Sequence, residues 1–334
     1  MDLGNIWFAL IAILFIGFFF LEGFDFGVGI LLPFLGKKDE ERRAIINSIG
    51  PFWDGNEVWL ITAGGAIFAA FPNWYATMFS GFYLALLLVL VALILRGVAF
   101  EFRSKNESKT WRENWDRIIF ASSTLLAVLW GVALANLIKG VPIDKTLNYV
   151  GGFFDLISVY TLVAGVTTLL VFIFHGAVFL SLKTTGDIEK KALKVAETEG
   201  IYAITASLIL IILTFVQTDL YKSSLAIAAS ILALVFLVLS LYLVNTKKVK
   251  FAMITNGFAI ALGVGALFLG LFPRVMVSNI SPEFSLTIQN ASSSLKTLSL
   301  MTKVALVFVP IVLGYQAWSY WVFRKRITVK DLEY

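Results

Sequence analysis

Acidic side chains occur inside apolar segments of this sequence, at spacings that favour proton exchange. Glu22 and Asp25 lie three residues apart in one apolar stretch, and Asp54 and Glu57 repeat that spacing at the start of the next. Residues three apart share one face of an α-helix. At the centre of a membrane helix a charged side chain costs at least about 2.5 kcal/mol unless it finds a partner or water. The pattern therefore predicts a functional carboxylate cluster.

This cluster has two interpretations. We expect Asp25, Asp54, Glu22 and Glu57 to line part of a path for protons or cations, because carboxylates in partly hydrated, low-dielectric surroundings can relay protons. In the alternative, Arg96, near the end of a third apolar segment, pairs with one carboxylate while the others cap helix ends near the membrane surface. In either case we expect Arg96 to act as a structural counter-charge.

The sequence contains one histidine, His175, and no cysteine. The lack of cysteine excludes disulfides, iron–sulfur ligation and thiolate chemistry, and a haem with two histidine ligands needs more than this chain supplies. His175 could ligate one haem axially or share a metal with a carboxylate, but we expect a hydrogen-bonded core residue or a proton relay. We expect no catalytic nucleophile, redox residue, metal site or cofactor on this chain.

The composition indicates which elements position these residues. Hydrophobic residues make up 59% of the 334 residues and charged residues 15%, with a mean hydropathy of +0.86. Soluble proteins are less apolar, and apolar runs of roughly 20 residues, long enough to cross a bilayer as helices, recur throughout. We predict an all-α integral membrane protein with a single transmembrane domain over residues 1–334 and no extramembrane domain. We expect about nine spans, at residues 6–34, 50–72, 75–102, 118–139, 150–182, 200–217, 223–245, 251–272 and 297–323.

The distribution of basic residues predicts the orientation of these spans. Lys and Arg concentrate in the loops after the first, third, fifth and seventh spans and in the C-terminal tail, for example Arg42, Arg103, Lys190 and Lys330. By the positive-inside rule, the N-terminus lies outside and the C-terminus in the cytoplasm of a multi-pass cell-membrane protein. The carboxylate cluster then falls in the cytoplasmic half. Because topology explains the net charge of +5, we expect no nucleic-acid partner.

Several longer motifs carry a family resemblance. Glu22-Gly23-Phe24-Asp25 begins the first, and Trp53-Asp54-Gly55-Asn56 lies within the second, which covers residues 42–65. Further matches lie at residues 79–83, 96–105, 272–276 and 315–321, whereas the middle of the chain is weaker. In these motifs the sequence resembles subunit II of cytochrome bd-type quinol oxidases.

The resemblance implies a fold of two four-helix bundles plus one additional helix. It also implies a heterodimer with a subunit I that carries haem b and haem d, in a respiratory complex that oxidises quinol, reduces oxygen to water and takes protons from the cytoplasm. In that family the acidic residues of the two motifs are associated with proton transfer, which points to Asp54 and Asp25. Members often have Gln at the position of Glu57, so the resemblance carries no role over to that residue.

Other functions remain open at this point. A secondary transporter or ion channel would also place carboxylates and glycine-interrupted helices within the membrane. A purely structural assembly subunit would keep the partner and lack the proton path. The sequence also leaves open whether small single-span subunits, a membrane lipid or a quinone bind to this chain, and whether ubiquinol or menaquinol is the donor.

Overall fold

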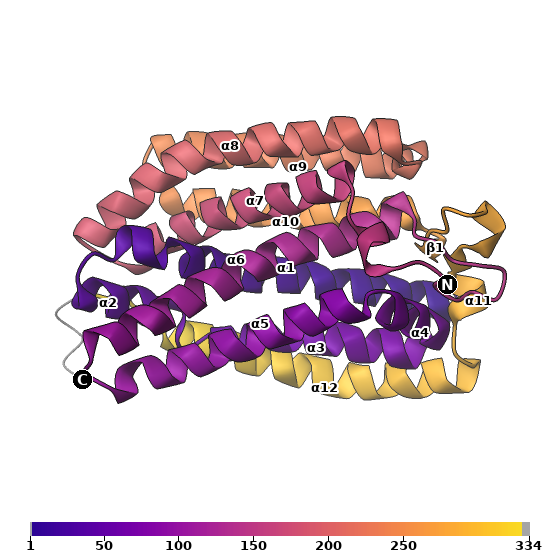
Figure 1. Cartoon of the computed structure of the whole chain (residues 1–334), viewed down its shortest axis with the longest axis horizontal. Helices are drawn as coiled ribbons and strands as arrows, with labels where there is room; N and C mark the ends of the chain where they lie inside the picture. The colour runs from indigo at the N-terminus through magenta and orange to yellow at the C-terminus, as the bar shows by residue number, and fades with distance from the viewer. Residues whose placement is uncertain (1, 329–334) are drawn as a thin grey trace.

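The structure is a computed structural model that describes residues 2–328, and helices dominate it (Figure 1). Lys330 and the rest of the expected cytoplasmic tail beyond residue 328 lie outside the described residues. A short antiparallel pair, β1 (Arg274–Met276) and β2 (Leu286–Thr287), is the sheet of the described part. The α-helices are α1 (Leu3–Leu35), α2 (Asp39–Ile49), α3 (Trp53–Ala70), α4 (Pro72–Gly81), α5 (Tyr83–Phe102), α6 (Lys109–Lys139), α7 (Val159–Lys183), α8 (Asp187–Gln217), α9 (Ser224–Asn245), α10 (Val249–Leu271), α11 (Ile288–Ala291) and α12 (Leu295–Val322).

Eight helices of the described chain are long and apolar enough to cross a membrane, which confirms the predicted class of all-α integral membrane protein. They are α1, α5, α6, α7, α8, α9, α10 and α12. The expected count of nine is not confirmed, because α3 falls below this limit. Its 18 residues begin with a polar turn that holds Asp54, Asn56 and Glu57. In Figure 1, α3 nevertheless runs along α1 and α12 from the end that bears α2 to the end that bears α4.

Several predicted boundaries were wrong. The span expected at residues 75–102 is two helices, α4 and α5, which meet at Phe82. Ser80 and Gly81 precede this break, but the residues on both sides are apolar enough that hydropathy gave one continuous segment. The span expected from residue 150 begins at Val159, where the Ser158 hydroxyl caps α7 by accepting a hydrogen bond from the Thr161 N–H. Helices α6 and α8 start earlier than expected because their first turns are charged and carry no hydropathy signal.

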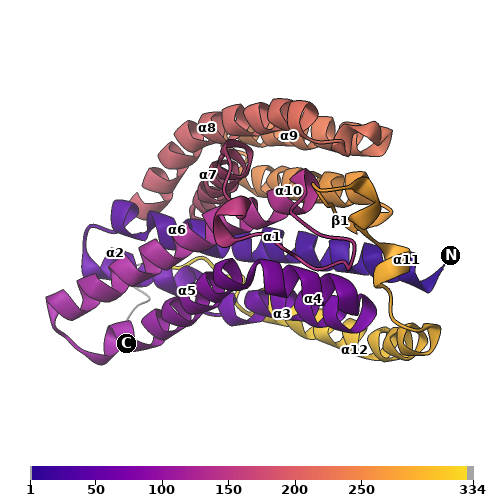
Figure 2. The same ribbon diagram turned by 45° about the vertical axis from the view of Figure 1, so that its right-hand side comes forward.

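Helix α1 is the centre of the molecule. It packs against α3, α6, α7 and α10, so it belongs to the interface between two groups of helices. Figures 1 and 2 show α7, α8, α9 and α10 on one side of α1, with α3 and α5 on the other and α12 beside α3. α6 packs against α1, α5 and α7. This arrangement agrees with two four-helix groups, α1, α3, α5, α6 and α7–α10, plus the additional helix α12.

The two ends of the molecule carry ordered connections. At the end where α1 begins, β1, β2 and α11 fold over the helix ends, so the stretch between α10 and α12 has structure. At the opposite end lies α2, an extra helix that the sequence did not predict. The N–H groups of Lys37 and Lys38 donate to Glu41 Oε2 at 2.7 and 3.2 Å and hold its start.

Candidate functional site

An arginine in the interior of the helices pairs with two carboxylates from different helices. Arg96 of α5 has a fully buried side chain, and its Nη1 donates to the equally buried Glu22 of α1 and to Glu57 Oε1 of α3 at 2.9 Å. The guanidinium also lies 4.9 Å from the ring centre of Phe26 and 5.2 Å from that of Phe100. The ionisable residues of three separate apolar segments therefore form one site.

Asp25 joins the same site through an amide. Its carboxylate is buried and accepts a hydrogen bond of 2.6 Å from Asn56 Nδ2, and it lies within electrostatic range of Arg96. Asn56 Oδ1 in turn accepts from the Tyr320 hydroxyl at 2.8 Å and from Gln316 Nε2 at 3.4 Å, both on α12. We name Glu22, Asp25, Glu57 and Arg96 the buried carboxylate cluster. Helix α12 supports it through Asn56.

The helical repeat explains which residues of α3 enter the cluster. The buried side of α3 contains Asn56, Ala63, Ile67 and Ala70, so this side faces α1. Asp54 is two residues before Asn56, about 200° around the helix, and its side chain is exposed. Within residues 2–328 no hydrogen bond or ion pair is recorded for Asp54. The structure thus brings together four of the five expected residues and leaves Asp54 on the surface.

The cluster contains buried polar atoms that the described chain does not pair. These atoms are Glu22 Oε2, Asp25 Oδ1, and Nε and Nη2 of Arg96. Three carboxyl groups face one guanidinium, so full ionisation would leave two negative charges without compensation. Uncompensated buried charge is costly. The site is therefore able to take up a proton, and its unpaired atoms offer hydrogen-bonding positions to water.

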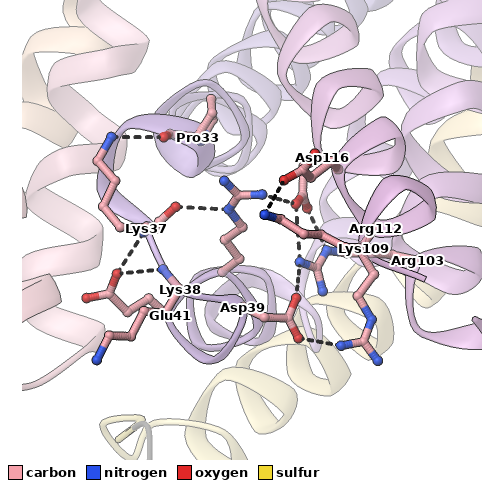
Figure 3. Close-up of polar contacts among 12 residues, drawn as sticks. Pro33, Lys37, Lys38, Asp39, Glu41, Arg103, Lys109, Arg112 and Asp116 are labelled. Carbon is pink, nitrogen blue, oxygen red and sulfur yellow. Dashed lines mark hydrogen bonds and ion pairs between the residues drawn. The ribbon is translucent and has the colours of Figure 1, made fainter. Parts of the chain in front are cut away.

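A second ionic cluster joins the helix ends beside α2 (Figure 3). Asp116 of α6 accepts hydrogen bonds from Arg103 Nε at 2.5 Å and from Arg42 Nη1 at 2.9 Å, while Asp39 accepts from Arg103 and Arg112 at 2.7 Å each. Partial burial raises the pKa of Asp39, but the hydrogen bond from Arg103 and the charges of Arg103 and Arg112 outweigh burial, so its pKa lies below the ordinary value. This cluster fixes α2 against α5 and α6.

His175 is a hydrogen-bonded core residue, one of the two roles expected for it. Its side chain is fully buried in α7, its Nε2 lies 2.9 Å from the main-chain oxygen of Phe20, and its Nδ1 lies 3.0 Å from Asn256 Nδ2. Both ring nitrogens are thus engaged by protein atoms, and neither is free to bind a haem iron. Among the described residues, no group of three His, Asp or Glu side chains is arranged to hold a metal ion.

Sequence analysis missed several residues of the site. Asn56, Gln316 and Tyr320 are neutral side chains, and insertion cost identifies only charged ones. Gln316 and Tyr320 are four residues apart and hence on one helical face, a signal that could have identified them. Asp116 was not singled out, and its partners Arg42 and Arg103 were read only as basic loop residues, because all three lie outside the apolar runs.

The fold and the cluster define a polytopic membrane protein with a buried ionic site in which carboxyl groups outnumber the single guanidinium. The chain matches the family described as "Cytochrome bd terminal oxidase subunit II" over residues 3–323. It is 45% identical over 332 residues to the Cytochrome bd ubiquinol oxidase subunit 2 of Bacillus subtilis, covering 99% of this chain and 98% of that one. It is 38% identical over 363 aligned positions to the Cytochrome bd-I ubiquinol oxidase subunit 2 of Escherichia coli K12, covering 98% and 96%.

A solved structure supports the same fold. A chain of the bd oxidase from Geobacillus thermodenitrificans superposes with a TM-score of 0.79 at 16% sequence identity, covering 96% of this chain and 99% of that chain. The protein belongs to the family of cytochrome bd oxidase subunit II. It is therefore a multi-pass membrane subunit of an oxidoreductase complex, which confirms the resemblance found in the sequence motifs.

Proposed function

We propose that this chain supports a haem-bearing subunit I in a heterodimeric quinol:oxygen oxidoreductase of the respiratory chain and supplies part of its cytoplasmic proton-intake path. One observation carries the proposal: Glu22 and Glu57 share one guanidinium in the interior of the helices, and Asp25 lies within electrostatic range of it. Quinol and oxygen are the substrates of the complex. Haem b and haem d belong to subunit I and supply its redox chemistry, while the residues of this chain bind and pass protons.

The geometry of the cluster supports the following account of proton binding and transfer. Burial makes an uncompensated negative charge costly, and a proton arriving at Glu22 or Asp25 removes that cost. The two carboxyl groups lie close enough to share this proton in a hydrogen bond. Arg96 keeps Glu22 and Glu57 in place. Asn56 donates to the other oxygen of Asp25, which leaves Oδ1 to exchange the proton. The cluster thus works as a relay with fixed geometry.

We also include Asp54 in the proposed proton path, although its side chain lies on the surface of this chain. It is exposed beside Glu57, and a Cβ at the neighbouring Gly55 would have no described atom within 4 Å other than those of its chain neighbours and its own helix backbone. The same is true of Gly64 and Gly65 further along α3. Small residues allow close helix approach in membranes. We assign this side of α3 and the exposed α12 to the contact with subunit I, where Asp54 passes protons between the chains.

The orientation follows from the basic loops, with the N-terminus outside and the C-terminus in the cytoplasm. In this orientation α2 and the ionic cluster of Figure 3 lie on the cytoplasmic side, the side from which protons enter. Each charge that crosses the membrane potential is worth about 2.3 kcal/mol per 100 mV. Proton uptake from the cytoplasm for oxygen reduction therefore conserves part of the redox energy.

Two carboxylate substitutions in the purified complex test the proposal. Asp25→Asn and Asp54→Asn should each slow quinol-dependent oxygen consumption per haem, with Asp25→Asn losing roughly 100-fold, the lower end of the effect of a proton-transfer group. Haem content should stay normal. Glu101→Gln, at an exposed carboxylate near the end of α5, is the matched control and should leave turnover unchanged. Normal turnover in both aspartate variants would refute the proton path, and a colourless preparation without a second chain would indicate a transporter instead.

A further inference from the structure

His175 links the second group of helices to α1. With the amide nitrogen of Asn256 facing Nδ1 at 3.0 Å, Nδ1 is the acceptor and Nε2 carries the proton that is donated to Phe20 O at 2.9 Å. Within residues 2–328, the other side-chain hydrogen bond recorded between α7–α10 and α1 joins Lys191 Nζ to Leu35 O at the end of α1. Among the described residues, His175 therefore makes the side-chain hydrogen bond that joins α7–α10 to α1 away from the helix ends.

The backbones of α1 and α7 touch beside this contact. A Cβ at Gly27 would lie 1.9 Å from the main-chain oxygen of Phe172, and a Cβ at Gly176 would lie 2.5 Å from the carbonyl carbon of Gly27. The Phe24 ring lies 5.9 Å from the ring of His175 and stacks on Phe179 at a centroid distance of 4.1 Å. These contacts hold the two helices at a fixed separation. The bond from His175 adds a directional constraint on the sliding and rotation of α1.

We propose that His175 is a positioning residue for the buried carboxylate cluster. Phe20 precedes Glu22 by two residues and Asp25 by five on the same continuous helix. A slip of α1 by one residue would move these carboxylates by about 1.5 Å along the axis and about 100° around it. The contact from Asn56 to Asp25 measures 2.6 Å and hydrogen bonds weaken beyond about 3.2 Å, so a fraction of this slip would break it. The proposal rests on the proton path proposed above.

Two substitutions at His175 separate its two hydrogen bonds. The amide nitrogen of Gln can occupy the place of Nε2, so His175→Gln keeps a donor toward Phe20 O. The shorter His175→Asn keeps a polar group near Asn256 and loses the bond to α1. We expect His175→Asn to lower oxygen reduction per haem by roughly tenfold, within the range of about 100-fold for a 1 Å misplacement. His175→Gln should retain most of the wild-type rate.

An infrared measurement distinguishes positioning from general packing. In pH-difference spectra of the purified complex, the carboxyl bands of Glu22 and Asp25 are assigned by their loss in Glu22→Gln and Asp25→Asn. The titratable groups facing this site are Glu22, Asp25, Glu57, Arg96 and Tyr320, with Asp54 next to Glu57. His175→Asn should shift these bands and the pH profile of turnover, while His175→Gln should leave both in place. If His175→Asn yields no haem-loaded complex, His175→Leu, which also lacks a donor toward Phe20 O, replaces it and should shift the bands in the same direction.

The outcomes separate this inference from the proposed function. Unshifted or unassignable bands in His175→Asn, or equal losses in the Gln and Asn variants, would overturn the positioning role. Shifted bands in His175→Asn, together with normal turnover in both Asp25→Asn and Asp54→Asn, would support the positioning role and refute the proton path. Shifted bands with slow turnover in both His175→Asn and Asp25→Asn would support the two together.

Discussion

Replacing Arg96 with methionine would remove the guanidinium that holds Glu22 and Glu57 in the helix interior. The side chains of Arg96 and Glu22 are fully buried and that of Glu57 is 16% exposed, so water cannot replace the lost partner efficiently. Breaking a buried ion pair by removing one member typically costs about 3–5 kcal/mol. We expect Arg96→Met to lower the free energy of unfolding of the purified complex by this amount, measured by denaturant titration in detergent.

A double substitution and a surface control test the physical reason. Adding Glu22→Gln to Arg96→Met removes one of the orphaned charges and should recover roughly 0.5–3 kcal/mol, the usual range for coupling between contacting residues. Arg324→Met, at an exposed arginine after α12, should change stability by less than about 0.5 kcal/mol. Equal stability of Arg96→Met and the unmodified complex, or no recovery in the double variant, would refute the view that Arg96 compensates buried charge.

Two further predictions concern contacts outside the buried carboxylate cluster. Hydrogen bonds from Arg274 at 2.7 and 2.9 Å hold the pKa of Asp219 below its usual value, so this pair should stabilise the fold above about pH 4 and lose that contribution as the pH falls through the lowered pKa. The melting temperatures of Arg274→Gln and of the unmodified complex should converge as the pH is lowered. A difference in melting temperature that stays constant with pH would contradict the pairing. Gly176→Ala should reduce the yield of haem-loaded complex, because its Cβ would meet the carbonyl carbon of Gly27 at 2.5 Å. Gly263→Ala, at an exposed glycine of α10 with open space at the Cβ position, should not reduce it, and equal yields would argue against the close contact.

The sequence by itself determined the class of protein and the composition of most of the cluster. Apolar runs long enough to cross a bilayer specify membrane helices through a local requirement, since hydrocarbon leaves no partner for an open backbone. The insertion cost of charge then identified Glu22, Asp25, Glu57 and Arg96 from residue type alone. The motifs around Asp25 and Asn56 supplied the family, which the comparisons confirm.

Tertiary structure alone decided which residues meet. Most of these helices are apolar on every side, so no stripe in the sequence shows which face packs inward. Packing against α1 turned Asn56 toward Asp25 and left Asp54 on the surface, although the spacing had placed Asp54 and Glu57 together. It also brought Tyr320 to Asn56 across 264 residues. Such contacts depend on where distant helices dock, and local sequence does not contain that information.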